Sequence, residues 1–202
     1  MEPYVITISR QFASLGRTIA QQLAEVLGIE FYDRDIVEAT AKRMQLPISM
    51  ISDEEEQANS TFLKRKNHLG MGVVNLEDEI FEVQANIIQD LASQESCIIV
   101  GRCGHFLLRE HPKSLHIYVY APYEARLHNC MHVLKMEEKT AHRMLREVDK
   151  AREVYRQRYA KGMEDIYDAF DLMIDSNRFG VEGTVSILTD IVKQRLKLDE
   201  PS

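Results

Sequence analysis

Short, mostly apolar segments alternate with longer segments of helical periodicity along the chain. The short segments are 4–8, 29–32, 97–100, 116–120 and 171–175. They are rich in β-branched and aromatic residues, which is typical of strands buried on both faces of a parallel sheet. Between them, apolar residues recur every three or four positions, which indicates amphipathic helices. The pattern therefore predicts an α/β fold in which helices cover both sides of a parallel sheet.

Two helical regions are longer than a simple crossover requires. The block after Asp33, residues 34–94, is mainly helical and is expected to form an insert over the ends of the strands. Residues 123–161 are charged and helical, and we expect them to form a lid. Gly28 is placed to end the first helix as a C-cap. No internal repeat or linker divides the chain, so residues 1–202 are interpreted as a single domain.

Candidate chemistry gathers at the carboxyl ends of the predicted strands, where ligands bind in such sheets. Residues 9–18 follow the first strand, Asp33-Arg34 the second and Gly101-Arg102 the third. Each of these three sites carries a cation, a phosphate-type loop or both. The clustering predicts a site for an anionic ligand at this edge of the sheet.

The loop after the first strand partly matches the phosphate-binding pattern G-x-x-x-x-G-K-[ST]. Gly16 and Thr18 stand in their places, Arg17 replaces the lysine, and Gln11 replaces the first glycine. Amides at a helix N-terminus attract phosphate, Arg17 can hold two phosphate oxygens, and the Thr18 hydroxyl is a candidate ligand for Mg²⁺. The competing interpretation is a tight strand-to-helix connection with Ser14 as an ordinary cap.

Two other strand ends each allow a functional and a structural interpretation. Gly101 lets another group approach the backbone and Arg102 is expected to point into the cleft, unless Arg102 is a loop arginine paired with a carboxylate. Asp33 is a candidate to bind metal through water or to orient Arg34. It is equally a candidate N-cap for the helix that follows.

The lid region carries a row of cations. Arg152 and Arg156 are four residues apart and share one helical face, with Asp149 one turn earlier. Arginines over a phosphate site offset the charge of a transferring phosphoryl group. The alternative is a solvated helix on which opposite charges pair along the surface.

Composition and charge exclude several classes of protein. The formal net charge is −7, which disfavours a nucleic-acid binder that relies on bulk positive charge. The three cysteines show no CxxC spacing, so they predict reduced thiols and a cytoplasmic protein rather than zinc or disulfides. No apolar stretch approaches the roughly 20 residues of a membrane span, so no membrane partner is expected. His128 and His132 flank Cys130 without a third ligand at a suitable spacing, so no metal is expected there.

Four motifs occur in one order along almost the whole chain. They are Ile8-Ser9-Arg10-Gln11 with Gly16-Arg17, then Phe31-Tyr32-Asp33-Arg34, Ile99-Val100-Gly101-Arg102, and Asn177-Arg178-Phe179-Gly180-Val181-Glu182-Gly183. Together they resemble the cytidylate kinase-like family, a branch of the P-loop nucleoside monophosphate kinases. The resemblance implies a three-layer P-loop NTPase fold with five parallel strands. In that fold, residues 34–94 are the insert that binds the nucleoside monophosphate and residues 123–161 are the lid.

The resemblance also implies substrates and residue roles. ATP with Mg²⁺ is the implied phosphoryl donor, and CMP or dCMP is the implied acceptor. By position, the implied donor-phosphate residues are Ser14, Leu15, Gly16, Arg17 and Thr18, with Thr18 toward the metal. The implied acceptor residues are Asp33, Arg34, Gly101, Arg102 and Asp149. The implied catalytic arginines are Arg17, Arg152 and Arg156, and the stretch after Asp175 borders the adenine.

The loop departs from the family pattern at Ala13 and Leu15, where related sequences usually have glycine. Side chains at these positions are expected to crowd a phosphate that needs close approach to the backbone. Two other functions therefore stay open. One is a regulatory protein that binds a nucleotide or another anion without turnover. The other is a kinase of a different small molecule.

Overall fold

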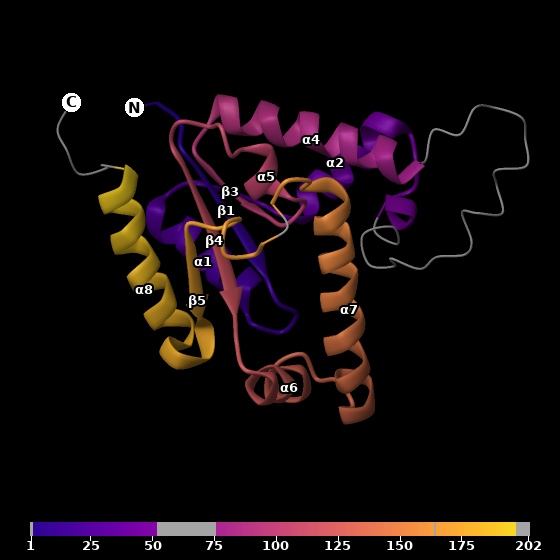
Figure 1. The fold of residues 1–202 in the computed structure, drawn as a ribbon, viewed down its shortest axis with the longest axis vertical. Coiled ribbons are helices and arrows are strands. Elements are labelled where there is room, and N and C mark those ends of the chain that lie inside the picture. Colours follow the sequence, from indigo (N-terminus) through magenta and orange to yellow (C-terminus); the bar gives the residue numbers. More distant parts are fainter. Residues whose placement is uncertain (1, 52–75, 164, 197–202) are drawn as a thin grey trace, which may run out of the picture.

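Five parallel strands form one sheet in the order β2-β3-β1-β4-β5 (Figure 1). The computed structural model describes residues 2–51, 76–163 and 165–196. The strands are β1 (Val5–Arg10), β2 (Glu30–Tyr32), β3 (Cys97–Val100), β4 (Ser114–Tyr120) and β5 (Leu172–Asp175). The predicted α/β fold with a parallel sheet of five strands is confirmed.

The helices alternate with the strands, as the hydrophobic pattern predicts. They are α1 (Gly16–Leu27), α2 (Arg34–Met44), α4 (Leu76–Gln94), α5 (Gly104–Leu107), α6 (Tyr123–His132), α7 (Glu138–Tyr159) and α8 (Ser176–Leu196). Gly28 ends α1 in the left-handed conformation, with φ 66°, as expected of a C-cap. The middle of the proposed insert, 52–75, lies outside the described residues.

Alternate residues of the strands build a core on each face of the sheet. Ile6 and Ile8 of β1 are fully buried against α1 and α8 on one face. Val5 belongs to the cluster on the other face, with apolar residues of α2, α4 and α5. Burial on both faces explains why these strands are apolar nearly throughout.

Two helices stand at the carboxyl ends of the strands. The helical region after β4 is divided into α6 and α7, and Lys135 between them takes a left-handed φ of 57°. The two helices pack against each other, and the 22-residue α7 stands to one side of the sheet (Figure 1). The strand ends and α7 therefore enclose a common space.

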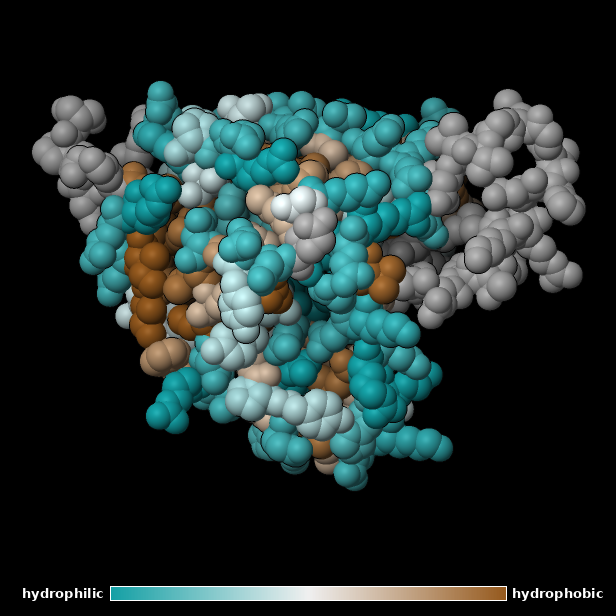
Figure 2. Space-filling model, viewed as in Figure 1, coloured by the Kyte–Doolittle hydropathy of each residue, from teal (hydrophilic) through white to brown (hydrophobic). Residues whose placement is uncertain are grey.

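The surface is polar over much of the molecule. On the face shown in Figure 2, hydrophilic side chains dominate over α4 and α7, and apolar ones gather on the side where α8 lies. In the part of the chain that the structure describes, no helix combines the length and the hydropathy needed to cross a bilayer.

Candidate functional site

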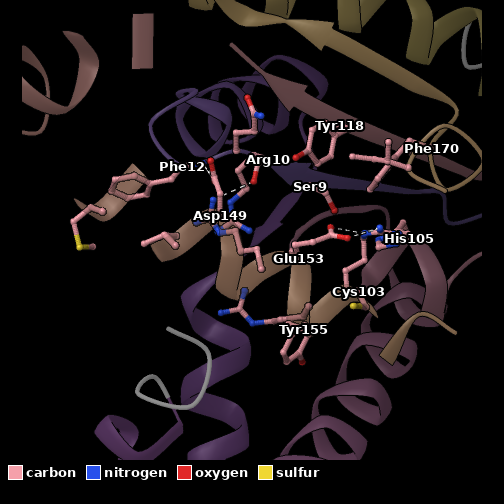
Figure 3. A pocket seen from close by; sticks show the side chains of 18 residues that line it. Ser9, Arg10, Phe12, Cys103, His105, Tyr118, Asp149, Glu153, Tyr155 and Phe170 are labelled. Atoms are coloured by element: carbon pink, nitrogen blue, oxygen red, sulfur yellow. Dashed lines mark hydrogen bonds and ion pairs between the residues drawn. The ribbon is translucent and has the colours of Figure 1, made fainter. Parts of the chain in front are cut away.

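A cavity of about 290 Å³ lies between the carboxyl ends of the strands and α7. Its walls come from the ends of β1 and β3, from α5, β4 and α7, and from residues 166–170 before β5. Figure 3 shows Phe12 at one end of this space and His105 with Phe170 at the other. The cavity lies at the edge of the sheet where the sequence predicts an anion site.

Four arginines and two carboxylates line the cavity. The arginines are Arg10, Arg102, Arg152 and Arg156, and the carboxylates are Asp149 and Glu153. The arginines come from β1, from the loop after β3 and from α7, so the tertiary fold brings them together. Converging guanidinium groups with fewer carboxylates favour an anionic ligand, and each guanidinium can bind phosphate oxygens in a bidentate manner.

Asp33 is the shared partner of two of these arginines, Arg10 and Arg102, and of Arg17 in α1. Its carboxylate is 2.6 Å from Nε of Arg17, 3.1 Å from Nη1 of Arg102 and 3.8 Å from Nη2 of Arg10. Burial works to raise the pKa of Asp33, but the attraction of Arg10, Arg102 and Arg17 outweighs it and holds this pKa below its usual value. Asp33 is therefore ionised at neutral pH and fixes the three guanidinium groups. The Asp33 side chain makes no capping hydrogen bond to α2.

The backbone conformation at position 101 favours glycine. Gly101 has a left-handed φ of 79°, and a Cβ atom there would lie 2.5 Å from Nη1 of Arg10. The group that approaches the Gly101 backbone in this structure is the Arg10 guanidinium of the same chain.

The loop between β1 and α1 takes the backbone shape that glycine usually provides. Ala13 and Leu15 have φ of 59° and 60°, in the left-handed region that disfavours side chains. Ser14 between them is fully buried, and its hydroxyl donates to the carbonyl oxygens of Gln11 at 2.9 Å and Val119 at 3.2 Å. Ser14 therefore anchors the loop to β4 and does not cap α1.

A brace from α6 and α7 holds the other side of the loop. We use the name loop brace for Arg126, Asp149 and the backbone of Phe12. The Phe12 N–H donates to Oδ1 of Asp149 at 2.7 Å, and Nη1 of Arg126 donates to Oδ2 of Asp149 at 2.5 Å. Arg126 also donates to the Phe12 carbonyl oxygen at 3.3 Å. Asp149 thus positions Arg126 of α6 as well as the loop backbone.

The N-terminus of α1 has no side-chain cap. Its N-cap residue, Leu15, makes no side-chain capping hydrogen bond, and no acidic residue lies in the first turn. The amides of Gly16, Arg17 and Thr18 are therefore left for an external acceptor. Thr18 is exposed on this turn, which suits a hydroxyl ligand of Mg²⁺. Within the described residues, no group of three or more His, Cys, Asp and Glu side chains is placed to hold a metal ion.

Arg152 and Arg156 extend from α7 into the cavity. Nη1 of Arg152 donates to the Arg10 carbonyl oxygen at 3.1 Å, which ties α7 to the end of β1. Nη2 of Arg156 is 2.8 Å from Glu153, and the hydrogen bond from Arg156 lowers the pKa of the Glu153 carboxyl. Glu153 is hence ionised and orients Arg156.

The predicted site residues fall into three places. Gly101, Arg102, Asp149, Arg152 and Arg156 line the cavity. The donor-loop residues Ser14 to Thr18 lie in the loop and the first turn of α1, outside the cavity lining. Arg34 lies apart from both, because its side chain is 73% exposed and pairs with Glu38 of α2 at 3.7 Å.

Three residues of the site were not singled out from the sequence. Arg10 is the last residue of β1, so the argument used for Arg102 just after β3 also applies to it. His105 has no signal beyond its place after Arg102. Arg126 is one of several arginines in a charged region, and only the tertiary structure shows that it is buried beneath the loop.

Solved structures with the same architecture include P-loop kinases. A protein of uncharacterized function from Eubacterium ventriosum ATCC 27560 is 24% identical, covers 96% of this chain and 98% of its own, and has a TM-score of 0.68. Shikimate kinase from Bacteroides thetaiotaomicron is 11% identical over 94% of this chain and 98% of its own, with a TM-score of 0.56. Shikimate kinase from Aquifex aeolicus vf5 is 19% identical over 95% and 98%, with a TM-score of 0.52. These likenesses establish the fold as that of P-loop kinases.

Sequence comparison is consistent with this architecture. No curated protein sequence matches the chain significantly. The model of the cytidylate kinase-like family matches residues 5–178, which include the phosphate-type loop and all the arginines that line the cavity. The chain therefore belongs to the cytidylate kinase-like family.

Proposed function

We propose that the protein transfers a phosphoryl group from ATP to a nucleoside monophosphate, with CMP or dCMP as the acceptor. One observation carries this proposal. Guanidinium groups from β1, β3 and α7 converge on a cavity at the strand ends, beside a helix N-terminus that has no side-chain cap. Membership of the cytidylate kinase-like family supports the same reaction class.

The donor phosphates are assigned to the loop and the first turn of α1. In this proposal Ser14, Leu15, Gly16 and Thr18 contribute the loop and helix amides, and the Arg17 side chain turns from Asp33 toward the phosphates. The Arg17 side chain is 58% exposed, and Asp33 keeps Arg10 and Arg102 as partners when Arg17 turns away. The Thr18 hydroxyl is the proposed protein ligand of Mg²⁺, and bound Mg²⁺ neutralises charge on the transferring phosphoryl group.

The acceptor phosphate is assigned to the cavity. Arg102 is oriented by Asp33 and lines the cavity next to Gly101. Arg34 is included as a second acceptor residue, reached by movement of its exposed side chain. Arg152 and Arg156 are the proposed catalytic arginines, because they reach the cavity from α7, and Asp149 holds the loop in place.

This arrangement needs no general base. The acceptor phosphate is already an anion at neutral pH and can attack directly. The rate then comes from holding the two phosphates in line and from placing positive charge where negative charge spreads in the transition state. The four arginines of the cavity supply that charge.

Two alternatives have specific support. Ala13 and Leu15 carry side chains in a loop that must approach phosphate closely, which favours a nucleotide-binding regulator without turnover. Two structurally similar proteins are shikimate kinases, which favours a kinase of another small molecule. The proposed nucleotide kinase agrees better with the family to which the chain belongs.

A coupled ADP-release assay separates the three functions. The assay uses ATP and Mg²⁺ with CMP, dCMP, the other nucleoside monophosphates and shikimate. We expect release with CMP or dCMP. Release only with another acceptor would replace the proposed substrate, and tight ATP binding with no release would favour the regulator.

Two variants assign the substrates to their sites. We expect Arg17→Ala to weaken ATP binding at least about tenfold, or about 1.4 kcal/mol, because the loop loses its cation. We expect Arg102→Ala to raise chiefly the KM for the acceptor. Arg195→Ala, at an exposed position near the end of α8, is the control and leaves both constants unchanged. Unchanged ATP affinity in the Arg17 variant would remove that residue from the donor site.

A further inference from the structure

His105 is a buried polar side chain in the wall of the cavity. It lies on the four-residue helix α5, only three residues after Arg102, and is 2% exposed. Its ring packs on Phe170 with centroids 4.6 Å apart, and Phe170 packs in turn on Tyr118 at 5.1 Å. All three rings line the cavity, and Figure 3 shows them together at one end of it.

Neither ring nitrogen of His105 has a hydrogen-bond partner among the described residues. Buried polar groups are nearly always paired, because burial removes their hydrogen bonds to water. A second buried histidine, His116, pairs one ring nitrogen, because its Nδ1 lies 2.8 Å from the Thr7 hydroxyl, and only its Nε2 lacks a partner among the described residues. Packing on Phe170 does not account for His105, because a phenylalanine would pack there without burying two polar atoms.

The His105 ring is neutral at physiological pH. Burial lowers the pKa of His105 to about 4, and the nearby His116 and Arg156 act in the same direction. A neutral imidazole offers one hydrogen-bond donor and one acceptor. It therefore suits an uncharged polar group, whereas the arginines of the same cavity suit an anion.

The side chains around His105 differ from it in chemistry, and the Tyr118 hydroxyl is a second uncharged donor and acceptor at this end of the cavity. The Cys103 thiol is also buried in the cavity wall, and burial raises its pKa to about 12, so it is a neutral and weak hydrogen-bonding group. Phe170 presents an apolar ring, and Arg102 and Arg156 present cations. At this end of the cavity, His105 thus joins a neutral donor and acceptor to an aromatic surface beside two positive charges.

We propose that His105 is a specificity residue of the acceptor cavity, and that its imidazole hydrogen-bonds to an uncharged polar group of the acceptor while the arginines hold the acceptor phosphate. A sugar hydroxyl and a polar group on the base share this chemistry. The inference rests on the proposed function, because it places the acceptor in this cavity. The inference adds to the proposed function a residue that recognises the uncharged part of the acceptor.

The test compares His105→Gln with His105→Met. The two side chains have similar size, but only glutamine keeps a donor and an acceptor. CMP binding is measured by calorimetry without ATP. We expect the methionine variant to lose CMP affinity at least about tenfold and the glutamine variant to lose less than about threefold. Inorganic phosphate, which lacks the uncharged part, is expected to bind equally to both variants.

Ribose 5-phosphate locates the recognised group. A loss of affinity in His105→Met that also appears with ribose 5-phosphate assigns the contact to a sugar hydroxyl. A loss confined to CMP assigns it to the base. Either result supports the role of His105.

Equal CMP affinity in the two variants, with wild-type protein that binds CMP, would overturn this inference alone. A parallel loss of phosphate affinity in His105→Met would also overturn it, because the effect would then extend to the anion. Wild-type protein that binds no CMP would overturn the proposed acceptor and this inference together. Should the methionine variant not fold, ¹⁵N NMR of the wild-type His105 ring decides. Ring shifts unchanged at saturating CMP would exclude the hydrogen bond.

Discussion

A single carboxylate organises the charges at the sheet edge. Asp33 is 8% exposed and lies within ion-pair distance of Arg10, Arg17 and Arg102, which come from three separate segments. Removing one partner of a buried ion pair leaves the opposite charge uncompensated, which is costly. Asp33 is therefore important to stability as well as to the position of the arginines.

We expect Asp33→Asn to lower the free energy of unfolding by about 3 kcal/mol at pH 7. The difference from wild type depends on pH. The folded-state pKa of Asp33 lies below the unfolded value, so its stabilisation is fully present above about pH 4 and is lost as pH falls further, through the folded pKa. Denaturant unfolding of wild type and Asp33→Asn, between about pH 2 and pH 7, measures the difference in the free energy of unfolding.

Asp35→Asn is the matched control for this prediction. Asp35 lies in the first turn of α2 but is exposed, so its removal should cost less than about 1 kcal/mol, from the helix dipole alone. Equal losses in the two variants would show that Asp33 contributes only as an acidic residue near α2.

At the residue scale, sequence reasoning finds groups that stand next to recognisable strand ends. Arg102 follows a clear apolar strand, and the structure places it in the cavity. The same reasoning does not identify Arg126, because the contact of its guanidinium with the loop depends on how α6 docks. It also cannot show that both ring nitrogens of His105 lie buried without partners, since that depends on three-dimensional packing.

At the scale of elements, the joint between β1 and α1 depends on one glycine. A Cβ atom at Gly16 would lie 2.7 Å from Cβ of Arg10 and 3.2 Å from Cβ of Val119. These neighbours are close to the backbone and cannot rotate away. Gly16 thus allows the first turn of α1 to lie against the ends of β1 and β4.

We expect Gly16→Ala to destabilise the protein by about 1–3 kcal/mol, because the new methyl group overpacks this joint. Gly183→Ala is the control in α8, where the nearest atom to an added Cβ lies at 3.4 Å. There, the better helix propensity of alanine should stabilise by about 0.5–1 kcal/mol. Thermal unfolding of both variants tests the contrast, and a neutral Gly16 variant would contradict the tight joint.

The strands and helices are largely predictable from the sequence, but the residues at which they begin and end are not. The strands at 97–100 and 116–120 are recognised because burial on both faces makes them apolar. The division of the lid region into α6 and α7 has no strong signal, since Lys135 is neither glycine nor proline yet takes a left-handed conformation. Ala13 and Leu15 also take left-handed conformations without being glycine. Tertiary hydrogen bonds of the loop impose this backbone shape.

At the scale of the whole molecule, α7 closes the site by contacts at its far end with α4. Arg158 pairs with Glu77 and with Asp78 at 2.8 Å, and the Tyr159 ring stacks on Phe81 with centroids 4.0 Å apart. Tyr155 also meets Phe81 edge-on at 6.1 Å. These contacts join α7, in the proposed lid, to α4, which ends the proposed insert.

We expect Arg158→Gln to increase opening of the C-terminal half of α7 by about two- to fivefold, the amount that follows from losing a partly exposed ion pair. Native-state hydrogen exchange measures this as faster exchange of amides in α7, with the amides of β1 unchanged. Arg143→Gln, at an exposed position on the same helix, is the control and should not alter exchange. Equal exchange in the two variants would show that the contact with α4 does not hold α7.

The loop brace has a mechanical consequence for any such movement. Asp149 lies on α7, yet its carboxylate accepts the Phe12 amide at 2.7 Å and the Arg126 guanidinium at 2.5 Å. A hydrogen bond tolerates a displacement of only a few tenths of an ångström before it weakens. A swing of α7 away from the sheet must therefore pull the β1–α1 turn along or leave Phe12 without its acceptor. Either way, the helix proposed to cover the acceptor cannot move without disturbing the loop proposed to hold the donor phosphates.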